Sequence, residues 1–103
     1  GIPGNVPRIF SEKNLGAKFD DLHDPHPAVA ELKKLGNLDD EEAYRTWHCG
    51  TALLLVCEEK DVEETCAALN QRDGEINAKK VGEITNSGKI ELVSKFSGKR
   101  LTF

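Results

Sequence analysis

Histidine and cysteine are the residue types in this sequence best suited to chemistry, and their spacing decides which chemistry to expect. His23 and His26 have His-x-x-His spacing, and His48 is followed directly by Cys49 further along the chain. Zinc accepts both types of ligand. The spacing is loose, however, and prolines interrupt the first pair, so these residues do not define a tetrahedral site. We therefore expect no metal site and interpret His23 and His26 as residues of a polar loop.

A thiolate–imidazole pair is the second chemistry that His48 and Cys49 suggest. Adjacent residues of an extended chain point to opposite sides, and catalytic Cys/His pairs are usually distant in sequence. The other cysteines, Cys57 and Cys66, lie in apolar surroundings and are interpreted as small core residues. An odd cysteine count without Cys-x-x-Cys spacing is not a disulfide framework. We predict no catalytic residue in this chain and a reducing, cytoplasmic setting.

Arg45 is the strongest candidate for binding a charged ligand. Arginine recognises phosphate or carboxylate through its planar fork, and Arg45 stands shortly before Gly50, where a turn is expected. The alternative is an exposed salt bridge to Glu41 or Glu42 on the same helix face. The acidic run 39–42 is interpreted as a helix start, favoured by the helix dipole, and not as a metal site. No glycine-rich phosphate loop with its lysine is present.

Charge and composition exclude several classes of partner. The 103-residue chain has a net charge of −4, whereas nucleic-acid binding needs a basic face. No apolar run approaches the roughly 20 residues of a membrane span, and the N-terminus shows no signal-peptide pattern. Basic residues gather near the C-terminus with few aromatic stacking partners, so we interpret them as a solvated strand face: Lys89, Lys95, Lys99 and Arg100. Because the sequence contains no methionine, we expect a processed or excised product.

Helices are predicted mainly in the first half of the chain. Residues 1–8, rich in glycine and proline, favour loop or turn, with Asn5 placed to cap a short helix after it. Pro27 opens a longer helix that Gly36 ends. A further helix starts near Asp39. The apolar stripe of the Pro27 helix consists of Ala28, Val29, Leu32 and Leu35.

The second half predicts strands around one more helix. Thr51–Cys57 is a continuous apolar run, typical of a strand buried on both faces. Asp61 is expected to cap the next helix. Ile76–Ile84 is a predicted strand with a bulge at Gly82, and Ile90 begins an alternating segment. We expect Val62, Thr65, Cys66 and Leu69 to form the apolar face of the helix.

The order of these elements predicts the fold class. Helices, a strand, a helix and then several strands indicate an α+β domain with helices packed on a largely antiparallel sheet. The chain length suits a single domain over residues 1–103. Trp47, the only tryptophan, is expected in a core or an interface because it carries a large apolar area.

Three stretches, in order, resemble the AIR synthetase (phosphoribosylformylglycinamidine cyclo-ligase) family. Residues 36–50 read Gly-Asn-Leu-Asp-Asp-Glu-Glu-Ala-Tyr-Arg-Thr-Trp-His-Cys-Gly. The family pattern there is Gly-Asn, a few polar residues, Glu-Met-Tyr-Arg-Thr-Phe-Asn and Gly-x-Gly-Met. Residues 4–8 resemble the family's Glu-Asn-Ile-Pro-Arg, and residues 80–84 are similar to its closing Ile-Gly-x-Ile. The resemblance covers roughly residues 1–92, and it identifies the chain as a portion of the family's C-terminal domain.

The resemblance implies a function for the full-length enzyme. ATP would phosphorylate the amide oxygen of formylglycinamidine ribonucleotide, an amidine nitrogen would attack the activated carbon, and phosphate would leave. It implies that ATP and Mg are bound mainly outside this chain, in a missing N-terminal domain, and that the full-length protein is a homodimer. The chain alone is expected to be inactive. Candidate substrate-cleft residues, expected to lie near one another beside two turns, are Asn5, Arg8, Arg45 and Gly50.

The sequence departs from the family at its best-matched stretch. Trp47-His48 replaces the family's Phe-Asn, and Ala52 stands at its second glycine. Two further functions stay open beside the cyclo-ligase: a stand-alone, non-catalytic interaction module, and another member of the superfamily, such as formylglycinamide ribonucleotide amidotransferase or selenophosphate synthetase. The Tyr-Arg-Thr context at residues 44–46 favours AIR synthetase over these relatives.

Overall fold

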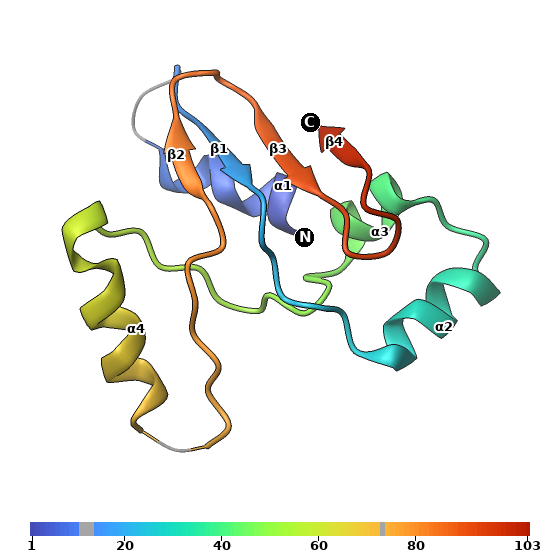
Figure 1. Cartoon of the computed structure of the whole chain (residues 1–103). Coiled ribbons are helices and arrows are strands. Elements are labelled where there is room, and N and C mark those ends of the chain that lie inside the picture. Colours follow the sequence, from blue (N-terminus) through green and yellow to red (C-terminus); the bar gives the residue numbers. More distant parts are fainter. Residues whose placement is uncertain (11–13, 73) are drawn as a thin grey trace.

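The structure is a computed structural model, and it describes residues 1–10, 14–72 and 74–103. Helices and strands alternate irregularly along the chain (Figure 1). None of the helices in these ranges has the length and apolar content needed to cross a bilayer. The elements are α1 (Ile2–Asn5), η1 (Val6–Ile9), β1 (Gly16–Phe19), α2 (Pro27–Leu35), α3 (Asp40–Thr46), η2 (Glu59–Asp61), α4 (Val62–Asn70), β2 (Glu83–Thr85), β3 (Ile90–Val93) and β4 (Arg100–Thr102).

The strands form one mixed sheet in the order β2-β1-β3-β4. β1 pairs antiparallel with β2 and parallel with β3, and β3 pairs antiparallel with β4. The register places Ala17 opposite Ile84 on one side and opposite Ile90 on the other. The predicted α+β class is therefore confirmed, with two antiparallel pairings and one parallel pairing.

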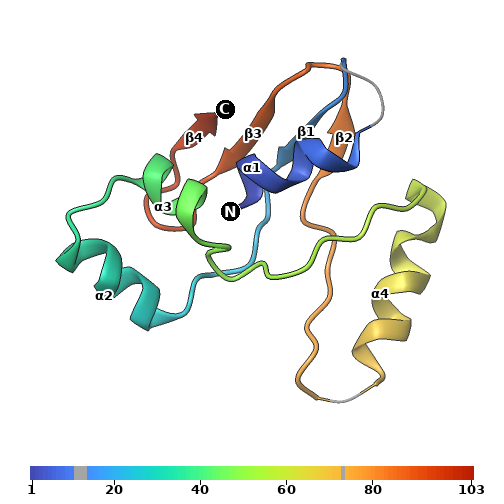
Figure 2. The same cartoon turned by 180° about the vertical axis from the view of Figure 1, so that it is seen from behind.

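One face of the sheet is covered by α1, which lies behind the strands in Figure 1 and in front of them in Figure 2. The N-terminus of α1 meets α3 closely: a Cβ added at Gly1 would lie 1.9 Å from the carbonyl oxygen of Tyr44. Glycine is therefore required at this approach of two backbones. The buried core between these layers consists of Ile2, Val6, Ala17, Phe19, Leu22, Ala43, Tyr44, Cys49, Ile90 and Leu92.

Two helices begin where the sequence predicts. The carboxylate of Asp39 accepts a hydrogen bond from the backbone N–H of Glu42 at 2.8 Å and caps α3. α2 begins at Pro27, where Nδ1 of His26 accepts from the N–H of Ala28 at 3.0 Å. No residue of α2 is buried, and its Leu35 is 81% exposed. The predicted stripe of α2 thus exists but has no partner among the described residues.

The prediction that Thr51–Cys57 is an interior strand is wrong. Only Thr51 is buried, and Leu53, Leu55 and Val56 are 79%, 58% and 59% exposed. Residues 52–57 have no secondary structure and make no backbone hydrogen bond to any other described residue. A strand needs a neighbour at hydrogen-bonding distance, and the sheet formed by the described residues offers none at this position.

Two further predictions need correction. The strand predicted over Ile76–Ile84 is confined to β2. Gly82, directly before β2, lies close to the backbone of β1, since an added Cβ would lie 2.2 Å from the carbonyl oxygen of Lys18. Residues 1–8 are helical and not a loop, because Pro3 suits the first helical turn and Ile2 and Val6 are buried. Asn5 precedes η1, but its side chain makes no cap and donates instead to the carbonyl oxygen of Gly1 at 2.8 Å.

Candidate functional site

Arg45 lies in the last turn of α3, at the edge of a shallow cavity of about 390 Å³. Its guanidinium pairs with Glu41 at 3.1 Å and stacks on the ring of Phe103, with 4.8 Å to the ring centroid. Arg45 is half-exposed, so the ion pair does not exhaust its donors. The cavity is lined by Pro3, Pro7, Phe10, Leu15, Arg45, Gly88, Ile90 and Phe103. Its described lining combines an apolar wall with the cation of Arg45, which suits an anionic ligand that carries an apolar group.

The other three candidate residues lie on other segments than Arg45. Asn5 and Arg8 are exposed on α1 and η1, the elements that also supply Pro3 and Pro7 to the cavity. Gly50 lines a second cavity, described below. These positions do not test whether one ligand is bound by all four candidate residues. That grouping stays a prediction: Asn5, Arg8, Arg45 and Gly50.

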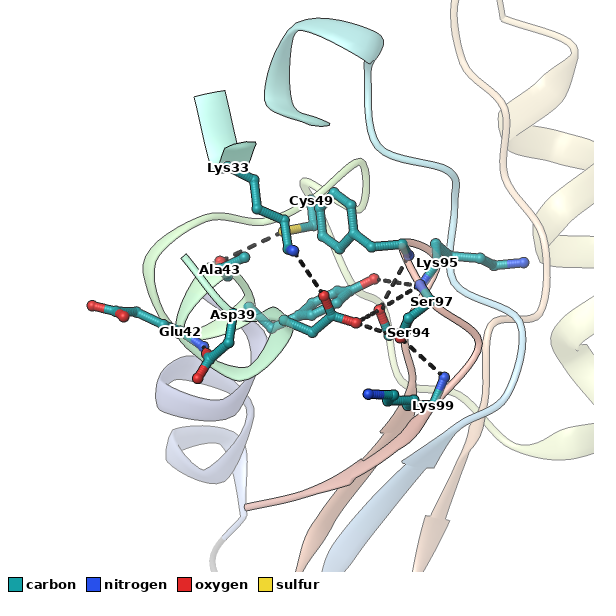
Figure 3. Close-up of polar contacts among 12 residues, drawn as sticks. Lys33, Asp39, Glu42, Ala43, Cys49, Ser94, Lys95, Ser97 and Lys99 are labelled. Atoms are coloured by element: carbon teal, nitrogen blue, oxygen red, sulfur yellow. Dashed lines mark hydrogen bonds and ion pairs between the residues drawn. The ribbon is translucent and has the colours of Figure 1, made fainter. Parts of the chain in front are cut away.

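A hydrogen-bonded hub around Asp40 fixes α3 against the turn between β3 and β4 (Figure 3). One oxygen of Asp40 accepts from the hydroxyl groups of Ser94, at 2.7 Å, and of Ser97. Its other oxygen pairs with Lys33 of α2 at 3.0 Å. Partial burial works to raise the pKa of Asp40, but the bonds from Ser97, Ser94 and Lys33 outweigh it and hold the pKa below its ordinary value.

Tyr44, one turn after Asp40, completes this attachment. Its side chain is fully buried, and its hydroxyl oxygen accepts from the N–H of Lys95 at 2.9 Å. The ring meets Phe96 edge-to-face, with centroids 5.7 Å apart. Burial raises the pKa of Tyr44, so this phenol stays neutral. Because α3 is fixed at Asp40 and Tyr44, the position of Arg45 is fixed as well.

Cys49 does not form a nucleophile with His48. Its thiol is buried and donates to the carbonyl oxygen of Ala43 at 3.6 Å. Burial raises the pKa of Cys49 to about 11, whereas a reactive cysteine needs a lowered pKa. The thiol therefore acts as a core group, as its immediate surroundings indicate.

His48 has a structural task in the turn that carries Gly50. Its Nδ1 accepts a hydrogen bond from the N–H of Gly50 at 3.1 Å. Cys49 and Gly50 both have positive φ, 50° and 97°. An asparagine side chain makes the same bond to the residue two positions on, so histidine can replace the asparagine of the family pattern at this turn.

The other histidines also bind backbone groups. Nε2 of His23 lies 2.6 Å from the carbonyl oxygen of Asn77, and its Nδ1 lies 3.4 Å from the hydroxyl of Thr51. His26 caps α2. Across residues 1–10, 14–72 and 74–103, no three His, Cys, Asp or Glu side chains gather as they would around a metal ion.

A second cavity is larger and mostly apolar, with a volume of about 550 Å³. We call it the apolar groove. Its walls are residues 51–57, the inner stripe of α4 and residues 75–84, and residues of η1 and β1 complete it. The apolar stripe predicted for α4 lines this groove with Val62, Thr65, Cys66 and Leu69. The prediction that this helix packs on the sheet is wrong, since none of its residues is buried. The interpretation of Cys57 and Cys66 as core residues is wrong as well, because Cys57 is exposed and Cys66 only partly buried.

Sequence reasoning missed two features of the region around Arg45. Phe103 is not among the candidate residues that the sequence indicates, yet it stacks on Arg45. Asp40 was interpreted only as part of a helix start, yet it also joins α2, α3 and the turn after β3. The alternation of Ile90 and Leu92 predicts the strand that brings Ser94 to Asp40, but no local signal predicts the pairing.

Comparison with known proteins gives a consistent result. The family described as AIR synthase related protein, C-terminal domain, matches residues 1–95. A phosphoribosylformylglycinamidine cyclo-ligase of Staphylococcus carnosus is 32% identical over 94 residues, which are 90% of this chain and 26% of that protein. A protein of the same name from Nitrosococcus oceani is 33% identical over 73 residues, which are 70% of this chain and 20% of that protein. The chain thus spans about a quarter of these relatives or less. No solved structure matches it significantly.

Proposed function

Because the chain belongs to the AIR synthase related protein, C-terminal domain family, we propose that it is the C-terminal part of an ATP-dependent cyclo-ligase. The reaction is the closure of formylglycinamidine ribonucleotide to aminoimidazole ribonucleotide in purine synthesis. The observation that carries this proposal is the continuous match over residues 1–95, together with relatives that bear the cyclo-ligase name. The chain alone is inactive in this proposal, since its match covers only 20% to 26% of such an enzyme.

ATP and Mg belong outside this chain in the same proposal. The sequence has no glycine-rich phosphate loop with a lysine, and the described residues gather no set of metal ligands. These residues therefore do not fit the cofactor, and we assign them no step of phosphoryl transfer. Their contribution is to position the ribonucleotide.

Arg45 is the residue we propose for that contact. It carries a cation at the cavity that residues of α1, η1, α3 and β3 line together with Phe103, and arginine holds phosphate or carboxylate through two parallel hydrogen bonds. Asn5, Arg8 and Gly50 are the further residues proposed for this wall of the substrate cleft. The partner is the remaining portion of the enzyme, and the full-length protein is proposed to be a cytoplasmic homodimer.

A chimeric enzyme tests the proposal. The 94-residue segment of the S. carnosus cyclo-ligase that aligns with this chain is replaced by the matching residues of this chain. We expect the chimera to restore purine-independent growth to a bacterium that lacks its own cyclo-ligase, and the isolated chain not to do so. A folded, stable chimera without cyclisation activity in vitro would refute the cyclo-ligase proposal.

Substitution of Arg45 tests the site within the active chimera. Arg45→Ala should weaken substrate binding by about 1.5–3 kcal/mol if the guanidinium holds a charged group. The cost to folding should be small, because the pair with Glu41 is solvent-exposed. Unchanged kinetics with a clearly lowered melting temperature would show that Arg45 is structural.

A further inference from the structure

One wall of the apolar groove, residues 52–57, is a chain segment without a strand partner among the described residues. Residues 52–57 form no backbone hydrogen bond with any described residue, so their N–H and C=O groups are free to pair. Leu54 packs against the core, while Leu53 and Leu55 on either side of it are largely exposed. Val56, which would share the face of Leu54 in a strand, is also exposed, at 59%, so the segment offers apolar side chains on both sides.

The opposite wall is only partly paired by backbone. Residues 76–82 have no regular secondary structure, and the carbonyl oxygen of Val81 accepts a hydrogen bond from the N–H of Asp21 at 3.2 Å. Asn70 of α4 pairs with Ala78 through both its amide nitrogen, at 3.0 Å, and its amide oxygen, at 2.6 Å, so a side chain makes the two bonds that a neighbouring strand would make. β2, which continues this wall, is an edge strand whose outer side is unpaired in the described sheet. Ile76 and Ile84 are exposed here.

Helix α4 stands apart from the sheet across the groove (Figures 1 and 2). All of its residues are described, and none of them is buried, although its inner stripe is apolar. An amphipathic helix that faces a groove of this kind gains stability only when something fills the groove. An exposed apolar surface of this extent marks an interaction site.

We propose that the apolar groove is the docking surface for the portion of a cyclo-ligase that lies outside the matched segment, and that this portion enters as β-strands pairing with residues 52–57 and with β2. The proposal rests on the proposed function for the identity of the partner. The matched relatives are about four to five times as long as the segment they share with this chain, so they contain ample chain to fill the groove. Strand addition supplies hydrogen bonds to the free backbone, and alternate side chains fill the apolar wall.

A second copy of this chain fits the groove less well. A twofold dimer brings the same patch of both copies together, and two concave surfaces meeting face to face leave a void between them. Voids in an interface lose packing contacts. A partner with a convex, strand-bearing surface avoids this loss.

The test uses Cys57, an exposed thiol that lines the groove. Its rate of alkylation is measured by peptide mass spectrometry in the isolated chain and in the S. carnosus chimera. The control thiol is introduced by Leu35→Cys, at a position 81% exposed and outside the groove. We expect Cys57 to react at least about tenfold more slowly in the chimera, with little change at the control. Equal reactivity of Cys57 in the two proteins would overturn the proposal.

A pair of charge substitutions gives an independent measurement. Leu53 and Leu35 are almost equally exposed, at 79% and 81%, but only Leu53 lines the groove. The isolated chain carrying Leu53→Asp or Leu35→Asp is mixed with the S. carnosus protein lacking its aligned segment, and binding is measured by calorimetry. Leu53→Asp should raise the Kd by about tenfold or more, and Leu35→Asp should leave it unchanged. Equal affinities for the two variants would overturn the proposal.

Two more measurements need no folded partner. Amide hydrogens of residues 52–57 should exchange rapidly in the isolated chain, and slow exchange in the monomer would show that the groove is closed. A dimer of the isolated chain in sedimentation, abolished by Leu53→Asp, would assign the groove to a second copy instead.

The chimera separates the two proposals. An active chimera with an unprotected Cys57 refutes the docking surface alone, whereas an inactive chimera with a protected Cys57 refutes the cyclo-ligase function alone.

Discussion

Of two neighbouring segments of the chain, the less apolar one is the more deeply buried. Residues 43–49 mix polar and apolar types, yet Ala43, Tyr44 and Cys49 are almost completely buried. Residues 51–57 are a nearly continuous apolar run, yet Leu53 is 79% exposed. Hydrophobicity therefore does not decide burial here. The first segment is packed by distant parts of the described structure, whereas in the second only Thr51 and Leu54 are held, by His23 and by the core.

The partners of the first segment come from distant parts of the chain. α1 closes on the backbone at Tyr44, and the turn after β3 supplies Lys95 and Ser94. No segment of the described chain approaches the outer side of residues 52–57 in this way. The two regions should thus respond very differently to equal changes, and the following experiments measure that difference.

The largest effect is expected at Tyr44. Tyr44→Ala removes a fully buried ring and leaves a cavity, which should cost about 3–5 kcal/mol of unfolding free energy. Leu53→Ala, in the second region, should stay within about 0.5 kcal/mol. Urea denaturation of the isolated variants measures both values. Similar costs for the two substitutions would contradict the contrast between the regions.

The Asp40 hub should contribute the next largest effect. Asp40→Ala removes hydrogen bonds between a charged carboxylate and Ser94 and Lys33, at a cost of about 1.5–3 kcal/mol near neutral pH. The cost should depend on pH. Because the folded pKa lies below the ordinary value of 3.8, the stabilisation is present above pH 3.8 and is lost as the pH falls through the folded pKa.

Denaturation of both proteins over a series of pH values measures this dependence. The difference in unfolding free energy between the unaltered chain and Asp40→Ala should shrink as the pH falls below 3.8. A difference that stays constant down to the acid limit of folding would show that the carboxylate charge has no part in holding α3.

Gly50 marks the boundary between the two regions. Its φ is 97°, and an added Cβ would lie 2.3 Å from the carbonyl oxygen of Asp24. Gly50→Ala should therefore cost about 1–3 kcal/mol through backbone strain. Gly4, in α1, has no atom near the position of an added Cβ, so Gly4→Ala should be neutral or slightly stabilising. Thermal melting of the two variants compares them, and equal melting temperatures would contradict the strain.

The smallest effect is expected at His48, which supports the same turn. His48→Ala removes the acceptor for the N–H of Gly50 and should cost about 0.5–1.5 kcal/mol. His48→Asn should restore most of this stability, because an asparagine oxygen accepts the same bond. If asparagine is no better than alanine in urea denaturation, His48 does not act through this hydrogen bond.

Much of the local structure is predictable from the sequence. The helix starts predicted at Pro27 and near Asp39 are those of α2 and α3, and the alternation that begins at Ile90 is that of β3. Each of these signals involves residues within a few positions of one another, so local interactions along the chain are sufficient to form the element. The family was also predictable, because its motifs are short and occur in order.

The sequence by itself therefore determined the α+β class, the family, and the positions of most helices and strands. Only the tertiary structure decided that Arg45 stacks on Phe103, that Asp40 joins α2 to the turn after β3, and that Leu53, Leu55 and Val56 remain exposed. The reason is physical. Hydrogen bonds within a turn and alternation along a strand depend on neighbours in sequence, whereas burial depends on whether another segment reaches the same place in space.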